Sequence, residues 1–145
     1  MKPLFILITI FSTLLSTTGF ANDPISQRAI KAFEQNFAEA KEVNWTTSPN
    51  LLKVQFVLNE QTLTAFYSID GEFLGVTRNI SSFQLPLMLQ AAVKKEYSNY
   101  WITELFELSG KNGTEYYITL EDADHKLTLK SQDSVYWSTY QKLRK

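Results

Sequence analysis

Hydrophobic and polar residues follow two different periods along this chain, and the two periods alternate twice. From Pro24 to near Ala40, apolar residues recur at the helical period of about 3.6, on a face formed by Ile25, Ala29, Ile30, Phe33 and Phe37. The period then changes to two, and polar residues separate the apolar Leu52, Val54, Phe56 and Leu58. The pattern predicts one helix and four short strands, which together end at residue 80.

A second helix followed by four strands is predicted from Pro86 to residue 143. The second helix has an apolar side that consists of Leu89, Ala92, Val93 and Tyr97. Strand alternation resumes at Trp101, and the last strand is expected at Val135–Tyr140.

Two sequence pairs, Asp70-Gly71 and Asn112-Gly113, predict hairpins, because a tight turn needs a positive φ that glycine adopts without strain. Strands linked by hairpins form antiparallel sheets, which can leave one face uncovered. We therefore expect an α+β fold in which two tandem helix–four-strand units, residues 24–80 and 86–143, form one antiparallel sheet with both helices on one face.

The first 21 residues are expected to be a secretory signal peptide. Lys2 is followed by the apolar run Leu4–Leu15, and the small residues Gly19 and Ala21 have the spacing of a cleavage site. The run is shorter than the ~20 residues that cross a bilayer, so we expect no membrane insertion after cleavage; the alternative is a retained N-terminal anchor. Cleavage after Ala21 leaves 124 of the 145 residues, a single domain at 22–145 in the periplasm or outside the cell.

Composition excludes several classes of function. The chain has no cysteine, which excludes disulfides, thiolate nucleophiles, cysteine-bound zinc, iron–sulfur clusters and a lipid anchor on cysteine. Without Lys2 the chain carries 13 basic and 15 acidic residues, so it lacks the basic excess that neutralises phosphates. We expect no cofactor and no nucleic-acid partner.

The single histidine, His125, is the one candidate for triad catalysis. It could work with Asp122 or Asp124, and the same carboxylates could hold a surface calcium ion. These residues are predicted at a turn between strands, where a solvated turn is the simpler interpretation. Asp70 and Asp133 could form an acid–base pair, but their matching positions favour a role in turns. We therefore expect no catalytic and no metal site.

Aromatic residues crowd the second unit. Strand alternation sends Tyr116 and Tyr117 to opposite faces, and likewise Tyr136 and Trp137, so one residue of each pair should lie on the face without helices. Tyrosine and tryptophan are common at the centres of protein interfaces. We expect Trp101, Tyr117 and Tyr136 to be protein-binding residues; the alternative is that such side chains fill a small second core.

Several short motifs together suggest a family. Each predicted helix ends in an aromatic residue, Trp45 lies on the first strand, and the first unit closes with Tyr67-Ser68-Ile69-Asp70-Gly71-Glu72, before Leu85-Pro86 opens the second helix. In these features residues 22–145 resemble the exported proteins with a PepSY-like, β-lactamase-inhibitor-protein-like (BLIP-like) fold, which occur mostly in Gram-negative bacteria. The chain departs from the pattern at Asp133-Ser134, where Asp-Gly would be usual.

The resemblance implies a curved antiparallel sheet, a location outside the cytoplasm and a non-enzymatic binding or inhibitory role. Because function depends on surface sites rather than on the fold, no binding residue is transferred from the family. We expect an exported binding protein that inhibits or modulates an extracytoplasmic protein such as a hydrolase. The alternatives are a small-molecule or lipid carrier with an aromatic-lined pocket, and a hydrolase that uses His125.

Overall fold

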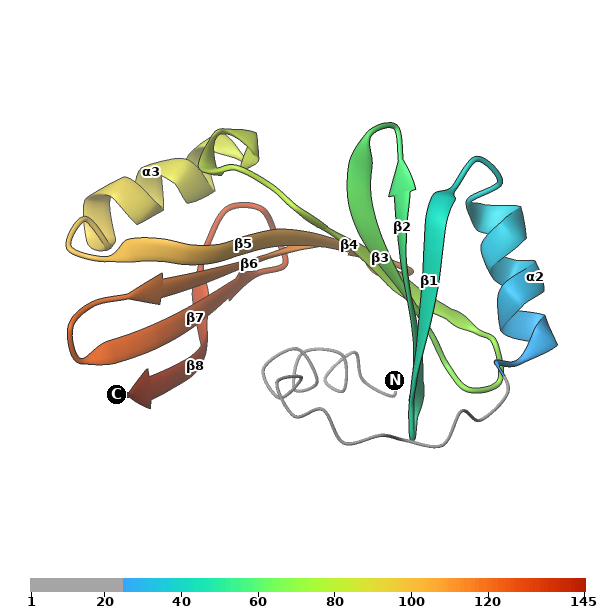
Figure 1. Ribbon diagram of the computed structural model, residues 1–145. Helices are drawn as coiled ribbons and strands as arrows, with labels where there is room; N and C mark the ends of the chain where they lie inside the picture. The colour runs from blue at the N-terminus through green and yellow to red at the C-terminus, as the bar shows by residue number, and fades with distance from the viewer. Residues whose placement is uncertain (1–24) are drawn as a thin grey trace. The chain divides into compact units, whose positions relative to one another are not determined.

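The computed structural model describes residues 25–145, in which two helices each precede four strands (Figure 1). The elements are α2 (Gln27–Asn36), β1 (Lys41–Ser48), β2 (Leu51–Leu58), β3 (Gln61–Tyr67), β4 (Phe73–Asn79), the 3-10 turn η1 (Ser82–Gln84), α3 (Leu87–Glu96), β5 (Trp101–Gly110), β6 (Gly113–Glu121), β7 (His125–Ser131) and β8 (Ser138–Arg144). Neighbouring strands are hydrogen-bonded in the order β1 to β8 within one antiparallel sheet. The expected α+β class and single eight-stranded sheet are confirmed.

The chain forms two compact units whose boundary lies inside β4. The first unit extends to Glu60 and includes Thr64–Leu74, and the second contains Gln61–Leu63 and Gly75–Lys145. The predicted sequence repeats instead divide after residue 80. That the repeats are equivalent, and that both helices share one face of the sheet, remain predictions.

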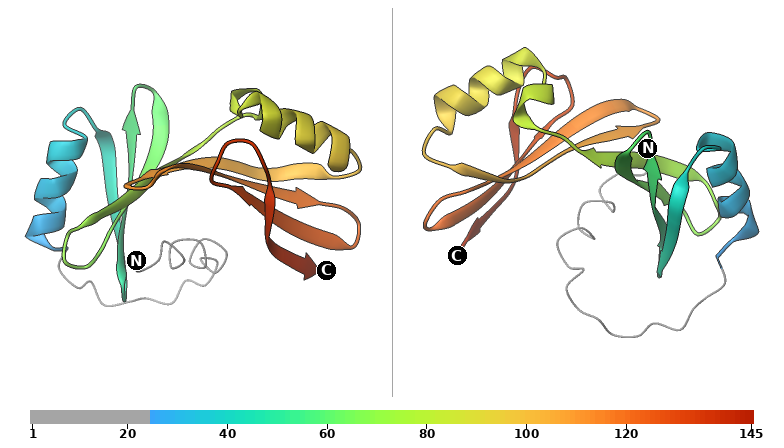
Figure 2. Two further views of the ribbon diagram at one scale, coloured as in Figure 1. Left: turned by 180° about the vertical axis from the view of Figure 1, so that it is seen from behind. Right: turned by 45° about the horizontal axis from the view of Figure 1, so that its top comes forward.

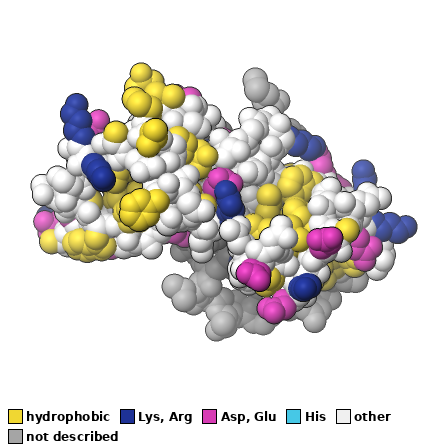
Figure 3. Space-filling model, turned by 90° about the horizontal axis from the view of Figure 1, so that it is seen from above, with side chains coloured by type: hydrophobic (Ala, Val, Ile, Leu, Met, Phe, Trp, Pro, Cys, Tyr) yellow, Lys and Arg dark blue, Asp and Glu magenta, His cyan; other side chains and the backbone are white. Residues whose placement is uncertain are grey.

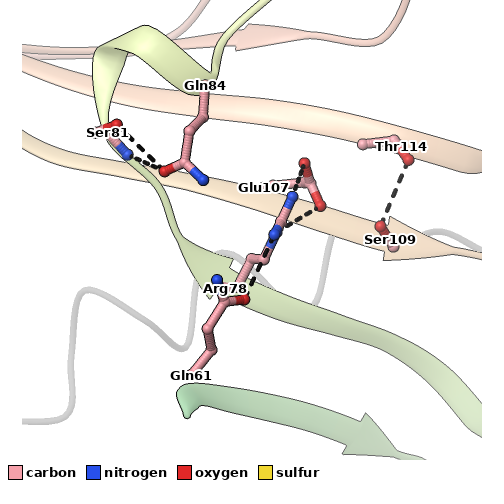
Figure 4. A network of polar contacts seen from close by, with 7 residues as sticks. All are labelled: Gln61, Arg78, Ser81, Gln84, Glu107, Ser109 and Thr114. Atoms are coloured by element: carbon pink, nitrogen blue, oxygen red, sulfur yellow. Dashed lines mark hydrogen bonds and ion pairs between the residues drawn. The ribbon is translucent and has the colours of Figure 1, made fainter. Parts of the chain in front are cut away.

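Pairing and a charged contact explain why most of β4 belongs to the second unit. Gly75 to Asn79 pair with β5 from Gly110 to Phe106. Beside this ladder, the Arg78 guanidinium donates two hydrogen bonds to the Glu107 carboxylate, with N–O distances of 3.0 and 3.2 Å, and lies 3.5 Å from Oε1 of Gln61 (Figure 4). A bidentate arginine–carboxylate pair fixes geometry as well as charge.

In the first unit, α2 packs through aromatic side chains. The Phe33 ring is 5.0 Å from that of Phe56 and 5.6 Å from that of Trp45, both in edge-to-face contact. Such pairs stabilise a core beyond the area they bury. The helix is shorter than predicted, because Phe37 has a φ of −137° and therefore ends it. The predicted start at Pro24 lies outside the described residues.

Gly71 holds the hairpin between β3 and β4 against α2. Its φ is +85°, which confirms the positive φ predicted at this turn, and its N–H donates to the Ser68 carbonyl at 2.9 Å. A Cβ at this position would lie 2.7 Å from the Ala29 nitrogen. Glycine is therefore required both by the backbone conformation and by the close approach to the helix.

In the second unit, α3 covers one side of strands β5–β7 (Figure 2). Its core contains Leu89 of α3 together with Ile80, Leu85, Leu105, Ile118, Leu120, Leu127 and Leu129. Tyr116 and Trp137 pack against this core, and the Trp137 indole N–H donates to the Leu89 carbonyl at 3.1 Å. Tyr136, by contrast, is exposed; it precedes β8, so its predicted place on the face without helices remains a prediction.

The position predicted for the last strand was wrong. The strand was expected at Val135–Tyr140, but β8 begins at Ser138. The Asp133 carboxylate accepts the N–H groups of Val135 and Tyr136, both at 2.9 Å, and Ser134 has a φ of +63°. An aspartate that caps its own turn in this way keeps the following residues out of a strand.

Candidate functional site

The candidate site is the side of β5–β8 that faces away from α3, called here the helix-free face. Ile118 and Leu120 enter the core under α3, so alternation places Tyr117, Thr119 and Glu121 of β6 on the helix-free face. Residues directly opposite in a ladder share a face. The register therefore adds Trp101, Glu104 and Phe106 from β5, and Lys126, Thr128 and Lys130 from β7.

The middle of the helix-free face is a packed aromatic layer. Phe106 and Tyr117 stack with ring centroids 5.1 Å apart and an interplanar angle of 13°, and Tyr140 meets Tyr117 edge-on at 5.9 Å. Tyr117 is only 1% exposed. Its side chain therefore offers no surface to a partner in this conformation, and it occupies the small second core that was the alternative for these aromatic residues.

Beside this layer lies a buried polar cluster centred on the carboxylate of Glu115. The Tyr117 hydroxyl donates to it at 2.8 Å, Gln132 Nε2 donates at 2.6 Å, and Lys130 Nζ forms an ion pair at 3.1 Å. Burial, and then the hydrogen bond to Glu115, raise the pKa of Tyr117 far above its ordinary value. Every group in the cluster has a partner, so the cluster stabilises the sheet.

One end of the helix-free face is exposed, and this end is the candidate contact surface. Four residues lie side by side across the strands, Trp101, Glu121, Lys126 and Leu143, and are called the Trp101 row. Trp101 is 52% exposed and Leu143 is 47% exposed. The row therefore has an exposed apolar residue at each end and an ion pair between them, and its tryptophan is of a residue type enriched at protein interfaces.

Lys145 fixes the tryptophan end of the row. Its ammonium group lies 5.1 Å from the centre of the Trp101 ring and 2.8 Å from the Glu121 carboxylate. The hydrogen bond from Lys145, the largest influence, lowers the pKa of Glu121. Cation–π contact and ion pairing limit the freedom of the indole, and a rigid aromatic side chain loses little entropy when it binds.

The three predicted contact residues do not form one patch. Trp101 lies at the end of the strands where β6 finishes, whereas Tyr136 lies in the loop between β7 and β8 at the opposite end. Tyr136 is 73% exposed, and Tyr117 is buried between the two ends. Sequence reasoning missed Leu143 and Lys145, because it ended the last strand at Tyr140.

The segment around His125 is a turn, as predicted. The Asp122 carboxylate accepts the N–H groups of Asp124 and His125 at 2.8 and 2.7 Å, and lies 3.3 Å from His125 Nδ1. Partial burial raises the pKa of Asp122, but these hydrogen bonds outweigh it and the pKa is lowered overall. Within residues 25–145, no three acidic or histidine side chains gather as a metal site would require.

The first unit contains two surface hollows, of about 530 and 490 Å³. The larger is lined by Glu39, Lys41, Val57, Leu58, Asn59 and Glu60, and the other by polar residues of α2 together with Ala32 and Gly71. Neither hollow has an aromatic residue in its lining, so neither is the aromatic pocket expected of a carrier. In the described part of the chain, no helix has the length and apolar character that a bilayer-crossing segment needs.

Comparison with known proteins identifies the fold. Neither a family model nor a curated protein matches this sequence. Among solved structures, the chain is similar to a BLIP-like protein of Bacteroides fragilis, with 16% identity, a TM-score of 0.72, and coverage of 87% of this chain and 89% of that chain. It is also similar to a DUF2874 family protein of Bacteroides ovatus, with 15% identity, a TM-score of 0.73, and coverage of 85% and 89%.

A third similar structure is a Bacteroides eggerthii protein provisionally assigned to the periplasm, with 12% identity, a TM-score of 0.69, and coverage of 87% of this chain and 90% of that chain. At these identities the comparisons show a shared fold alone. The predicted BLIP-like fold is confirmed, and the PepSY-like part of the resemblance remains a prediction.

Proposed function

We propose that this chain, which has the fold of BLIP-like proteins, is an exported, non-enzymatic binding protein that docks another extracytoplasmic protein through the Trp101 row. Export is supported by the sequence pattern of residues 1–21 and by the periplasmic assignment of one structure with the same fold. Inhibition or modulation of a partner such as a hydrolase is the form of binding that the resemblance suggests.

The observation that carries the proposal is the exposure of a fixed tryptophan on the helix-free face. An exposed indole held by Lys145 and bordered by charged residues combines a large contact area with polar neighbours. Tryptophan is enriched among the few interface residues that supply most of the binding energy. Tyr136 remains a second predicted contact at the far end of the strands.

A non-enzymatic role is supported by the arrangement of the candidate catalytic groups. The Asp122 oxygen that contacts His125 Nδ1 also accepts the backbone N–H groups of Asp124 and His125, the arrangement of an aspartate that caps its own turn. The Tyr117 hydroxyl and the Glu115 carboxylate hydrogen-bond each other within the sheet. No observation favours the small-molecule or lipid carrier over the binding protein.

The proposal is tested by site-specific cross-linking followed by affinity measurement. A photo-reactive amino acid replaces Leu143 in the exported chain, and the matched control carries it at Ile69, which is 51% exposed in the first unit. We expect a protein product from position 143 that position 69 does not give. The captured protein is then purified, and its dissociation constant is measured with the original chain and with variants.

Trp101→Ala should weaken this binding about 30-fold or more, the factor that follows from the ~2 kcal/mol typical of an interface hot spot. Tyr136→Ala reports whether the loop at the far end contributes. Circular dichroism verifies that each variant is folded. Equal cross-linking from positions 143 and 69, or unchanged affinity in Trp101→Ala, would exclude the Trp101 row as the docking surface.

A further inference from the structure

Three large apolar side chains at the start of α3 point into solvent. Phe83 of η1 is 86% exposed, and Leu87 and Met88 in the first turn of α3 are 80% and 57% exposed. We call these three residues the α3 tip. Seen from above, hydrophobic side chains protrude from the unit that carries α3, and basic side chains lie next to them (Figure 3).

The α3 tip is held in this exposed position by its surroundings. Leu85, between the exposed residues, is buried, and the Gln90 side chain donates to its carbonyl at 2.7 Å. At the start of η1 the Ser81 N–H donates to Gln84 Oε1 at 2.8 Å, as part of a capping box. The exposure of Phe83, Leu87 and Met88 is therefore part of the ordered structure, and their hydration costs free energy that a partner surface could recover.

Two lysines lie on the same side of α3 as its exposed apolar residues. Leu87 and Lys94 are seven residues apart, as are Met88 and Lys95, and seven residues are close to two helical turns. Each exposed lysine therefore lies on the same side of α3 as an exposed apolar residue, about 10 Å further along the axis. In a chain of net charge −1, residues 73–95 contain no aspartate or glutamate.

We propose that the α3 tip and Lys94/Lys95 form a site that adsorbs to an anionic lipid surface. Apolar side chains that enter the boundary between headgroups and acyl chains, with cations alongside, are the two signals that hold a protein on such a surface. The ten-residue α3 would lie on the bilayer without crossing it. This contact is separate from the docking of a protein by the Trp101 row.

The size of the tip favours a lipid surface over a second copy of the chain. Three side chains of this kind present roughly 400 Å² of apolar area, whereas a stable protein interface buries about 800 Å² on each partner. A lipid surface needs no complementary shape and can accept isolated protruding side chains. Residues 73–95 add no carboxylate that anionic headgroups would repel, and the one acidic residue of α3 is Glu96 at its last position.

The test uses co-sedimentation of the exported, processed chain with vesicles of phosphatidylglycerol and phosphatidylcholine, compared with phosphatidylcholine alone. We expect binding to the anionic vesicles that weakens as salt increases. Lys94→Gln with Lys95→Gln should lower the partition coefficient about 30-fold, because each lysine near such a surface contributes about fivefold. Phe83→Ser with Leu87→Ser and Met88→Ser should lower it about 100-fold or more.

Matched controls distinguish vesicle binding by the α3 tip from nonspecific adsorption of the protein. Ile69→Ser removes an exposed apolar residue of the first unit, and Lys31→Gln with Lys41→Gln removes two exposed cations of the same unit. These controls should bind like the original chain, and since all variants share one N-terminus, its lipid affinity cannot produce the difference. Absence of binding, equal binding to neutral vesicles, or equal loss in the controls would overturn the proposal. A concentration-dependent dimer that Leu87→Ser abolishes, without vesicle binding, would replace the lipid by a second copy.

Discussion

Gly71 is required both for its backbone conformation and for its close packing against α2. Comparing Gly71→Ala with Gly113→Ala separates these two requirements, because Gly113 shares only the first. Both glycines have positive φ, +85° at Gly71 and +108° at Gly113. Around Gly113 nothing lies within 4 Å of an added Cβ, whereas at Gly71 this atom would lie 2.7 Å from the Ala29 nitrogen and 2.8 Å from the Arg28 carbonyl carbon. Both variants carry the backbone penalty, but only Gly71→Ala carries a collision.

The magnitudes follow from these two contributions. An L-residue in the left-handed region costs roughly 1–2 kcal/mol, and this applies to both variants. The loss of glycine freedom in the unfolded chain also applies to both, so it cancels in the comparison. At Gly71 the colliding atoms belong to the backbone of α2 and cannot rotate away, so the hairpin or the helix must shift, at a further cost of about 1–3 kcal/mol. Gly71→Ala is therefore expected to lose about 2–5 kcal/mol of unfolding free energy.

Urea unfolding followed by circular dichroism measures this difference. With a slope of about 1–3 kcal/mol per molar urea, the midpoint of Gly71→Ala should fall about 1 M further than that of Gly113→Ala. With Trp101 and Trp137 replaced by phenylalanine, fluorescence of Trp45, whose ring contacts Phe33 beneath α2, reports the first unit separately. Equal losses in the two variants would refute the reasoning, since they would show that α2 accommodates the methyl group without cost.

Three further changes test other parts of the structure. Glu60→Gly should stabilise the chain by about 0.5–1 kcal/mol in thermal unfolding, because Asn59 and Glu60 both have positive φ in a two-residue turn that prefers Asn-Gly; a lower midpoint would contradict this. Tyr117→Phe keeps the ring but removes the hydroxyl that donates to Glu115, so it should cost about 1 kcal/mol in urea unfolding, and no loss would mean that this bond is not stabilising. Hydrogen bonds from the backbone of its turn lower the pKa of Asp133, so its stabilisation is present above the unfolded-state pKa and disappears as pH falls through the folded-state pKa. The stability advantage of the original chain over Asp133→Asn should therefore shrink below about pH 4 in urea titrations, and an advantage that does not vary with pH would exclude this carboxylate as the cause.

Features set by neighbours in sequence could be predicted well. Asp70-Gly71 predicted a positive φ because the requirement lies within the turn itself. Alternation separated Tyr116, which packs against the core under α3, from Tyr117 on the helix-free face, because adjacent side chains of a strand point to opposite faces. The BLIP-like fold was predicted from the family resemblance that short local motifs suggested.

Features set by distant parts of the chain could not be predicted. The burial of Tyr117 depends on Phe106 and Tyr140, which reach it from other strands, and no local pattern records that packing. The end of β8 was missed for the same kind of reason, because Asp133 delays the strand and Leu143 joins it through pairing with Lys126. The Trp101 row therefore emerged only when the register of four strands was known.

The unit boundary within β4 determines which fragments of the chain keep β5 paired. Gly75 to Asn79 cover the outer edge of β5, although the sequence repeat assigns them to the preceding half. A fragment that starts at residue 86 would leave that edge open as a template for aggregation, whereas one that starts before Gly75 would keep β5 paired and expose the edge of β4 that faces β3. Separation at the apparent repeat junction would therefore break the β4–β5 ladder and the Arg78–Glu107 ion pair, both of which a break before Gly75 keeps.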